Sequence, residues 1–454
     1  MSLVDTVNPF NGQVEHRQAN QTDAQVDAIL AAAEHAFPQW AALPSSVRAD
    51  YLRKTAAELR KRKDDIQQAM TAEMGKLKKE ALGEIEKCAA ACEWYADNGA
   101  RYLADEAIAT EARSSYVHYE PIGCVFAVMP WNFPIWQVFR FIAPTFIAGN
   151  VAVLKHAVNV PRCADLIKDV LDAAGVPAGV FGVLHIDNDQ AANVIRDPRI
   201  AAVTLTGSER AGKSIGATAG SVLKKCVLEL GGSDAFVVLD DADLDIAIPA
   251  AVTSRFSNAG QTCIAAKRFI VTPGIAETFI ARFVEAAAKL QAGDPNDDAT
   301  TLAPMARADL RDELDKQVQA SVAAGAKVLL GGEPDASHAG YPATIIDNVV
   351  PGMPAYSQEM FGPVASILRA KDEADALRIA NDTTFGLGGS VWTRDVAKGE
   401  AFARQLQCGA AFVNASVRSD ARLPFGGSKR SGYGRELAEH GIREFTNIKT
   451  IYVA

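Results

Sequence analysis

The sequence predicts an α/β protein with two doubly wound parallel sheets and a small additional β element. Short, continuously apolar segments alternate with helical segments from residue 125 onward. Strands of that kind are typical of parallel sheets that are buried on both faces. The series pauses at Gly231 and Gly232 and then resumes, which predicts a second sheet. With 454 residues, 48% of them hydrophobic, the chain is long enough for two or three domains with separate cores.

The N-terminal part of the chain is predicted to be helical. Apolar residues recur at intervals of three and four over residues 23–40. A longer helix is expected from Pro44 to Met74, where Gly75 ends it, and a third over residues 78–97. The charged faces of these helices are expected to point to solvent.

A strand with mixed faces is expected at residues 114–119, with no helical partner nearby. The tail, residues 446–453, is predicted to be a strand that pairs with it, within one chain or across subunits. The buried strands of the first sheet are predicted at residues 125–129, 151–155, 180–184, 202–206 and 226–230, with helices at 161–174 and from about Gly212. Those of the second sheet are predicted at residues 235–239, 269–271, 327–330, 364–370, 390–393 and 411–414.

Composition excludes several classes of function. The net charge is −9 and the pI about 5.4, with acidic residues spread along the chain. Nucleic acid is therefore not an expected partner, because phosphate binding needs a basic face. The seven cysteines have no paired spacing, which indicates free thiols and no disulfide or metal site. Residues 1–9 do not resemble a signal peptide, and no apolar run reaches the roughly 18 residues of a membrane helix. We expect a cytoplasmic protein without a membrane segment.

One motif suggests a nucleotide triphosphatase. Residues 207–214 (GSERAGKS) follow a predicted strand and match the P-loop pattern, and Asp240 and Asp241 resemble a Walker B pair. A P-loop is usually the first strand-to-helix turn of its domain, whereas here at least three strands precede it. The same turn can present backbone N–H groups to the pyrophosphate of another ligand. A P-loop NTPase stays open as an alternative.

Cys263 is the candidate nucleophile, at the end of residues 256–263 (FSNAGQTC). A thiol nucleophile needs a base, and its reaction needs a donor for the oxyanion. Glu229 is a candidate base, because it ends a buried strand at the edge where open α/β sheets bind ligands. Asn132 is a candidate donor. A paired structural carboxylate and a turn residue are the alternative interpretations of Glu229 and Asn132.

Five segments then resemble the aldehyde dehydrogenase superfamily, in the family's order and over nearly the whole chain: residues 130–134 (PWNFP), 228–232 (LELGG), 256–263, 359–363 (EMFGP) and 424–427 (PFGG). The spacing of 34 residues between Glu229 and Cys263 is also similar to the family's. The resemblance implies that the Cys263 thiolate attacks an aldehyde, that Asn132 and the Cys263 N–H stabilise the oxyanion, and that hydride transfer to a nicotinamide leaves a thioester. Glu229 would then activate the water that hydrolyses the thioester.

The resemblance also implies domains and a cofactor site. It implies a dinucleotide-binding domain (residues 1–112 and 125–230), a catalytic domain (231–428) and an oligomerisation element (113–124 and 429–454), in a homodimer or homotetramer. The residues expected to bind the cofactor are Trp131, Lys155, Gly207, Ser208, Gly212, Leu230, Glu359 and Phe361. Val158 stands where the family often has a carboxylate that binds both ribose hydroxyls. Because a carboxylate there would repel a 2′-phosphate, we expect NADP to be accepted or preferred, with NAD also possible.

The substrate interpretation depends on three residues. Arg140, Ser419 and Phe425 match positions that surround the substrate in succinate-semialdehyde dehydrogenases, where an arginine binds the carboxylate. A second arginine is commonly found six residues before the cysteine, but Ser257 occupies that position here, with Arg255 two residues earlier. An ion pair is the alternative role for Arg140. The leading hypothesis is NAD(P)-dependent oxidation of succinate semialdehyde; another small or dicarboxylic semialdehyde, such as glutarate semialdehyde, and a non-catalytic relative are the alternatives.

Overall fold

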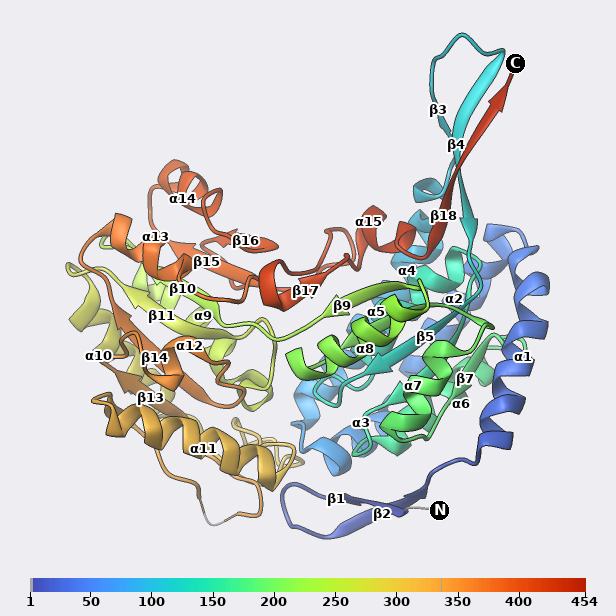
Figure 1. Cartoon of the computed structure of the whole chain (residues 1–454). Coiled ribbons are helices and arrows are strands. Elements are labelled where there is room, and N and C mark those ends of the chain that lie inside the picture. The colour runs from blue at the N-terminus through green and yellow to red at the C-terminus, as the bar shows by residue number, and fades with distance from the viewer. Residues whose placement is uncertain (1–2, 336) are drawn as a thin grey trace.

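The chain forms two α/β lobes with a thin β arm that projects from one of them (Figure 1). We describe a computed structural model, which covers residues 3–335 and 337–454. Each lobe contains one mostly parallel sheet covered by helices, so the predicted fold class is confirmed.

The sheet of the first lobe has the order β17-β9-β8-β5-β6-β7. Its five parallel strands are β5 (Cys124–Met129), β6 (Val151–His156), β7 (Phe181–Val183), β8 (Ile200–Thr206) and β9 (Lys225–Glu229). Edge strand β17 (Gly432–Tyr433) is antiparallel to β9 and comes from the C-terminal part of the chain. The chain builds β5, β6 and β7 outward and then returns to add β8 on the other side of β5. This reversal of strand order marks where such sheets bind ligands.

Eight helices belong to this part of the chain: α1 (Asp23–Ala41), α2 (Ser45–Lys61), α3 (Lys63–Met74), α4 (Lys78–Tyr102), α5 (Trp136–Ile147), α6 (Pro161–Ala173), α7 (Asn188–Arg196) and α8 (Glu209–Ser221). The single long helix expected over residues 44–74 is wrong, because Arg62 (φ −98°, ψ 15°) interrupts it and separates α2 from α3. An N-terminal hairpin of β1 (Leu3–Val7) and β2 (Val14–Ala19) was not predicted. The expectation of solvent-facing charges is also wrong for part of α4, as described below.

The sheet of the second lobe has the order β12-β13-β14-β11-β10-β15-β16. Its strands are β10 (Asp234–Val238), β11 (Ala266–Val271), β12 (Lys327–Leu330), β13 (Thr344–Asp347), β14 (Val364–Arg369), β15 (Gly388–Trp392) and β16 (Ala410–Val413). Only edge strand β12 is antiparallel to its neighbour among these described strands. The helices are α9 (Leu244–Phe256), α10 (Ala276–Ala287), α11 (Ala308–Ala323), α12 (Pro354–Ser357), α13 (Glu373–Asn381) and α14 (Val396–Ala403), with 3₁₀ turns at Ser257–Gly260 and Lys429–Ser431.

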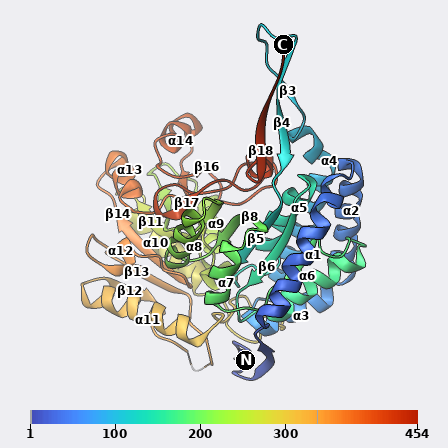
Figure 2. The ribbon, with the colours of Figure 1, turned by 45° about the vertical axis from the view of Figure 1, so that its right-hand side comes forward.

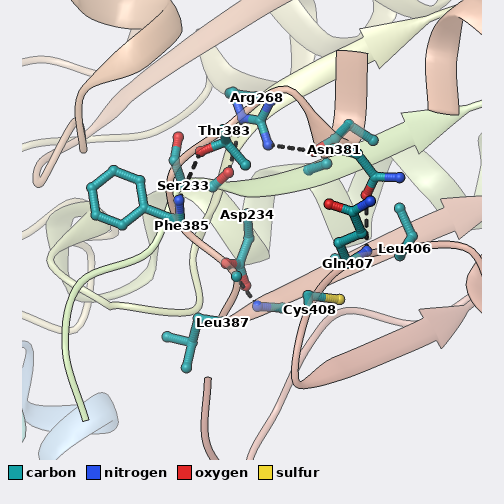
Figure 3. A pocket seen from close by; sticks show the side chains of 15 residues that line it. Ser233, Asp234, Arg268, Asn381, Thr383, Phe385, Leu387, Leu406, Gln407 and Cys408 are labelled. Carbon is teal, nitrogen blue, oxygen red and sulfur yellow. Dashed lines mark hydrogen bonds between the residues drawn. The ribbon is translucent and has the colours of Figure 1, made fainter. Parts of the chain in front are cut away.

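Buried charges fasten the loops of the second lobe (Figure 3). Arg268 donates to the carbonyl oxygens of Ser233, Ile379 and Ala380 at 2.8–2.9 Å, and Asp234 accepts from the Gly388 N–H at 3.0 Å. Burial lowers the pKa of Arg268 to about 10 and raises that of Asp234 to about 6. These contacts connect the beginnings of β10 and β15 to the end of α13, so we interpret this cluster as structural.

The arm consists of β3 (Glu106–Ala107), β4 (Ser114–Pro121) and β18 (Thr446–Val453) (Figures 1 and 2). The tail strand β18 pairs antiparallel with β4 over its full length, from Thr446 opposite Pro121 to Val453 opposite Ser114. The predicted pairing of these two strands therefore occurs within one chain. The segment before it, including α15 (Ala438–Arg443), packs on the first lobe, where Leu437, Ile442 and Phe445 are buried.

Candidate active site

Four neighbouring strands of the first sheet deliver candidate site residues to one edge. In the order β9, β8, β5, β6, their carboxyl ends carry Glu229, Gly207, Asn132 and Lys155. Cys263 comes from the second lobe, in the loop before β11. The site therefore lies between the lobes, at the carboxyl ends of the strands of the first sheet.

The turn that carries Cys263 has an unusual backbone. Asn258 and Ala259 have φ values of 54° and 51°, in the left-handed region that costs energy for residues with a side chain. Gly260 follows at φ 69°, and a Cβ there would lie 2.3 Å from the Gly362 carbonyl oxygen. Buried Arg255 donates to the Gly260 carbonyl oxygen at 2.5 Å. These contacts hold the turn in one conformation and leave the Cys263 side chain half-buried at its end.

Asn132 is attached directly to this turn. Its side-chain Nδ2 donates to the Gln261 carbonyl oxygen at 2.9 Å, which uses one of its two N–H bonds. The backbone carbonyl oxygen of Asn132 accepts from Asn258 Nδ2 at 2.9 Å and from Lys76 Nζ at 3.0 Å. The second N–H of the amide is the group that an oxyanion near Cys263 would use.

Burial shapes the acid–base chemistry of the site. The Glu229 side chain is almost fully buried and makes no hydrogen bond in the structure. Burial and the nearby Glu436 carboxyl raise its pKa well above the usual range, and Arg140 opposes the shift. Burial also raises the pKa of the Cys263 thiol to about 11, against the charges of Arg140 and Lys267. The thiol is therefore protonated near neutral pH, and Glu229 is a stronger base than an ordinary carboxylate once it is ionised.

The first lobe presents a pocket beside the start of α8 that is lined by Lys155, Ser208 and Arg210. Ser208 caps α8, with its Oγ accepting from the Ala211 N–H at 3.3 Å. Burial lowers the pKa of Lys155, which forms no ion pair with any described carboxylate. Val158, two residues after β6, is 46% exposed and adds no negative charge. A buried cation without a partner, next to a helix N-terminus, suits the ribose and phosphates of a dinucleotide.

Gly212 and Leu230 lie against each other beside this pocket. A Cβ at Gly212 would be 2.6 Å from the terminal methyl groups of Leu230, so a larger residue there would have to displace this side chain. Leu230 is buried with Leu205 and Leu228.

The P-loop alternative is wrong. Helix α8 begins at Glu209, so only Gly207 and Ser208 separate it from β8 and no long phosphate-binding loop exists. Lys213 points to solvent and pairs with Glu209 at 2.6 Å. Asp240 lies in the second lobe, where it accepts from Thr272 and from the Gly274 N–H.

Glu359 and Phe361 form the wall of the site on the second lobe. Glu359 accepts from the Gly232 N–H at 3.0 Å and pairs with Lys267 Nζ at 3.3 Å. Lys267 in turn donates to the Cys263 carbonyl oxygen at 2.6 Å. The ring of Phe361 packs edge-on against Trp131 at 5.8 Å. The structure thus brings residues from both lobes into one site.

Arg140 is 2% exposed and already has a partner. It forms an ion pair with Glu436, donates to Thr206 Oγ1 at 3.1 Å and stacks on the ring of Phe425 at 4.8 Å. The ion pair that sequence reasoning considered as an alternative role is thus present, in the interior and not at a surface. Glu436 was not found from the sequence, because it belongs to no recognised motif.

Position 257, where a second arginine is commonly found in succinate-semialdehyde dehydrogenases, carries no cationic side chain here. Ser257 is exposed, and Arg255 is buried and donates to the carbonyl oxygens of Gly260 and Ala266. Ser419 accepts instead from Lys87 Nζ at 2.7 Å. Lys87 lies on α4, a helix to which the sequence assigned no role.

Two carboxylates of α4 also reach the site. Glu84 accepts from the N–H groups of Ile135 and Trp136 at 2.9 and 2.8 Å and pairs with Lys76. Glu80 accepts from the Asn258 N–H at 2.8 Å. These side chains fasten the loops of Asn132 and Cys263, so this face of α4 points inward and not to solvent.

Comparison with known proteins agrees with this arrangement. Residues 2–451 match the aldehyde dehydrogenase family model. The chain is 50% identical to the NAD(P)+ succinate semialdehyde dehydrogenase Sad of Escherichia coli (strain K12), over 94% of this chain and 93% of that protein. It is 46% identical to a probable NADP+ succinate-semialdehyde dehydrogenase of Synechocystis sp. (strain ATCC 27184 / PCC 6803 / Kazusa), over 99% of this chain and 100% of that protein.

A solved structure has a closely similar fold. The succinic semialdehyde dehydrogenase of Streptococcus pyogenes, in complex with NADP+, superimposes with a TM-score of 0.97 at 38% identity, over 99% of each chain. Among the described residues, none of the helices is both long and apolar enough to cross a lipid bilayer. The site geometry, the family model and these relatives agree, and the chain belongs to the aldehyde dehydrogenase family.

Proposed function

We propose that this chain oxidises succinate semialdehyde to succinate with NADP or NAD as the hydride acceptor. The observation that carries the proposal is the meeting of Cys263, Asn132 and Glu229 between the lobes, with the cation of Arg140 close enough to influence the Cys263 thiol. Relatives at 46–50% identity over nearly the whole chain are named for this activity.

The proposed chemistry uses one cysteine twice. The fraction of Cys263 that has lost its proton to water adds as thiolate to the aldehyde carbon, and the thiohemiacetal oxyanion is stabilised by the Asn132 amide and the Cys263 N–H. A bound nicotinamide supplies the hydride acceptor for the oxidation that leaves a thioester on Cys263. Glu229 then takes a proton from the water that hydrolyses the thioester, and succinate leaves. The raised pKa of Glu229 suits a group that accepts protons near neutral pH.

The cofactor would be held mainly by the first lobe. We assign the ribose to Lys155 and Glu359, the pyrophosphate to Gly207, Ser208 and the start of α8, and the nicotinamide wall to Trp131 and Phe361. The uncharged Val158 is compatible with a 2′-phosphate, which supports acceptance of NADP.

We further propose a homodimer or homotetramer formed through the arm. Its outer strand β18 exposes Ile448 (62%), Tyr452 (51%) and Val453 (44%) and has one free edge. An exposed apolar edge strand is a ready site for pairing with another chain. Deletion of residues 446–454 should reduce the assembly to a smaller species in size-exclusion chromatography with light scattering; an unchanged mass would contradict this role.

An aldehyde panel with both cofactors tests the function. Succinate semialdehyde, glutarate semialdehyde and butanal should be ranked in that order by kcat/KM, and Cys263→Ala should abolish turnover of all three. A higher kcat/KM for butanal or for glutarate semialdehyde would reject the proposed substrate, and turnover by Cys263→Ala would reject the mechanism.

A further inference from the structure

One face of α4 is built into the site. Glu80, Glu84 and Lys87 follow one another at intervals of four and three residues, so they share a face of the helix. The first two hold the loops of Cys263 and Asn132 through backbone N–H groups. Lys87 is next in this row, and it is therefore positioned by the same contacts that position the nucleophile and the oxyanion donor.

Within the part of the chain that the structure describes, Lys87, unlike Glu84, forms no ion pair. Among the described residues, no carboxylate lies within 4.0 Å of its ammonium group. Nζ donates to Ser419 Oγ at 2.7 Å and lies 4.3 Å from the ring centroid of Trp136. The side chain is only partly exposed, and burial, followed by repulsion from Arg140, lowers its pKa to about 8. A partly buried cation with no partner is costly unless an anion binds beside it.

Three other cations near the site already have partners. Arg140 pairs with Glu436, and Lys267 pairs with Glu359. Arg255 is used by backbone carbonyl groups in the core. Lys87 is thus a partly buried cation of this region that has no ion pair with any described residue. It donates to Ser419 and packs on Trp136 of α5, the helix that also carries Arg140.

We propose that Lys87, together with Ser419, binds the terminal carboxylate of the aldehyde substrate and replaces the second arginine that is absent at Ser257. Arg140 contributes a fixed positive charge behind them, with its geometry set by Glu436, Thr206 and Phe425. The ammonium and the hydroxyl supply N–H and O–H donors to the carboxylate, and the Trp136 ring covers the lysine stem. This inference rests on the proposed function, because it concerns a substrate with a carboxylate.

The test compares Lys87→Met with the unchanged enzyme on succinate semialdehyde and on butanal. Loss of a charge-assisted contact should raise KM for succinate semialdehyde by about 10- to 100-fold while kcat and the kinetics of butanal change little. Succinate should also become a weaker inhibitor of butanal oxidation by a similar factor. Lys87→Arg should restore most of the affinity. Lys79→Met, at an exposed position of α4, is the matched control and should change neither KM.

Separate outcomes reject the inference and the function beneath it. If the unchanged enzyme prefers succinate semialdehyde but Lys87→Met leaves KM and succinate inhibition unchanged, Lys87 does not bind the carboxylate and the proposed function stands. Arg418 is an exposed cation next to Ser419 in the sequence. If Arg418→Met raises KM for succinate semialdehyde while Lys87→Met does not, Lys87 likewise does not bind the carboxylate. If the unchanged enzyme shows no preference for the carboxylated aldehyde, the proposed substrate itself fails. Equal losses on both aldehydes would assign Lys87 a structural role.

Discussion

Replacing Glu84 by Gln should weaken both the fold and the oxyanion site. The side chains of Lys76 and Glu84 are 0% and 1% exposed, and they form an ion pair. Removing one partner of such a pair leaves a buried charge and costs about 3–5 kcal/mol of the free energy of unfolding. Because domains are typically stable by about 5–15 kcal/mol, the variant should still fold but unfold at clearly lower urea concentration.

The catalytic effect follows from the contacts of Lys76. Its Nζ donates to the Asn132 carbonyl oxygen at 3.0 Å and lies 3.8 Å from the ring centroid of Phe133. With Glu84 neutral, this lysine loses its anchor, and the loop that carries the Asn132 amide loses a restraint. Complete loss of one oxyanion donor costs about 100- to 1000-fold in kcat, so a displaced donor should cost less, about tenfold.

A double-mutant cycle with Lys76→Met provides the assay. Urea unfolding of Glu84→Gln, Lys76→Met and the double variant should show a double cost smaller than the sum of the single costs by at least about 2 kcal/mol, because the second change removes the orphaned charge. Glu86→Gln is the control, since its pair with Arg60 is exposed and worth about 0–1 kcal/mol. Additive costs, or a Glu84→Gln variant as stable as Glu86→Gln, would refute the reasoning.

Three further predictions concern the chemistry and the cofactor. The rate of Cys263 alkylation by iodoacetamide in the cofactor-free enzyme should rise with pH through a midpoint near 11, the pKa to which burial raises this thiol, and level off only above it; a plateau below pH 8 would contradict this. Glu229→Gln should release about one equivalent of NADPH per site in a burst and then turn over at least about 100-fold more slowly, because hydrolysis of the thioester lacks its base. In the unchanged enzyme the rate of thioester hydrolysis should increase as the pH rises through a pKa above the ordinary carboxyl range, because Glu229 acts as a base when it is ionised. Val158→Glu should raise KM for NADP by about 5- to 100-fold relative to NAD through repulsion of the 2′-phosphate, and an unchanged ratio would place the phosphate elsewhere.

Most of the first sheet could be predicted from the sequence because its strands are buried on both faces. A continuous apolar run such as residues 125–129 carries an unambiguous signal of that burial. The break at Arg62 has no such signal, since neither Gly nor Pro occurs there and the helical pattern continues across it. The start of α8 was placed too late, near Gly212, whereas the helix begins at Glu209 and Gly212 lies inside it against Leu230.

The candidate site could be predicted only where its residues stand in motifs. Cys263, Glu229 and Asn132 each lie in a recognisable segment. The structure places Glu229 and Asn132 at the carboxyl edge of the first sheet, with Cys263 in the loop before β11 of the second lobe. Glu436 could not be found in this way, because its importance comes from pairing with Arg140, a residue 296 positions away in the sequence. A contact between residues so distant in sequence leaves no local pattern.

Helix α4 shows the physical origin of that limit most clearly. On a surface helix, charges at intervals of three and four normally face solvent and form weak pairs, as Glu86 and Glu93 do with Arg60. Glu80, Glu84 and Lys87 are charged residues of the same helix at intervals of four and three, but they face inward, where each charge meets a backbone N–H, a buried lysine or a serine hydroxyl. The two faces differ in what packs against them and not in composition. Because the inward face joins the loop of Cys263, the loop of Asn132 and the surroundings of Ser419, we expect substrate binding and catalysis to depend on the orientation of this one helix.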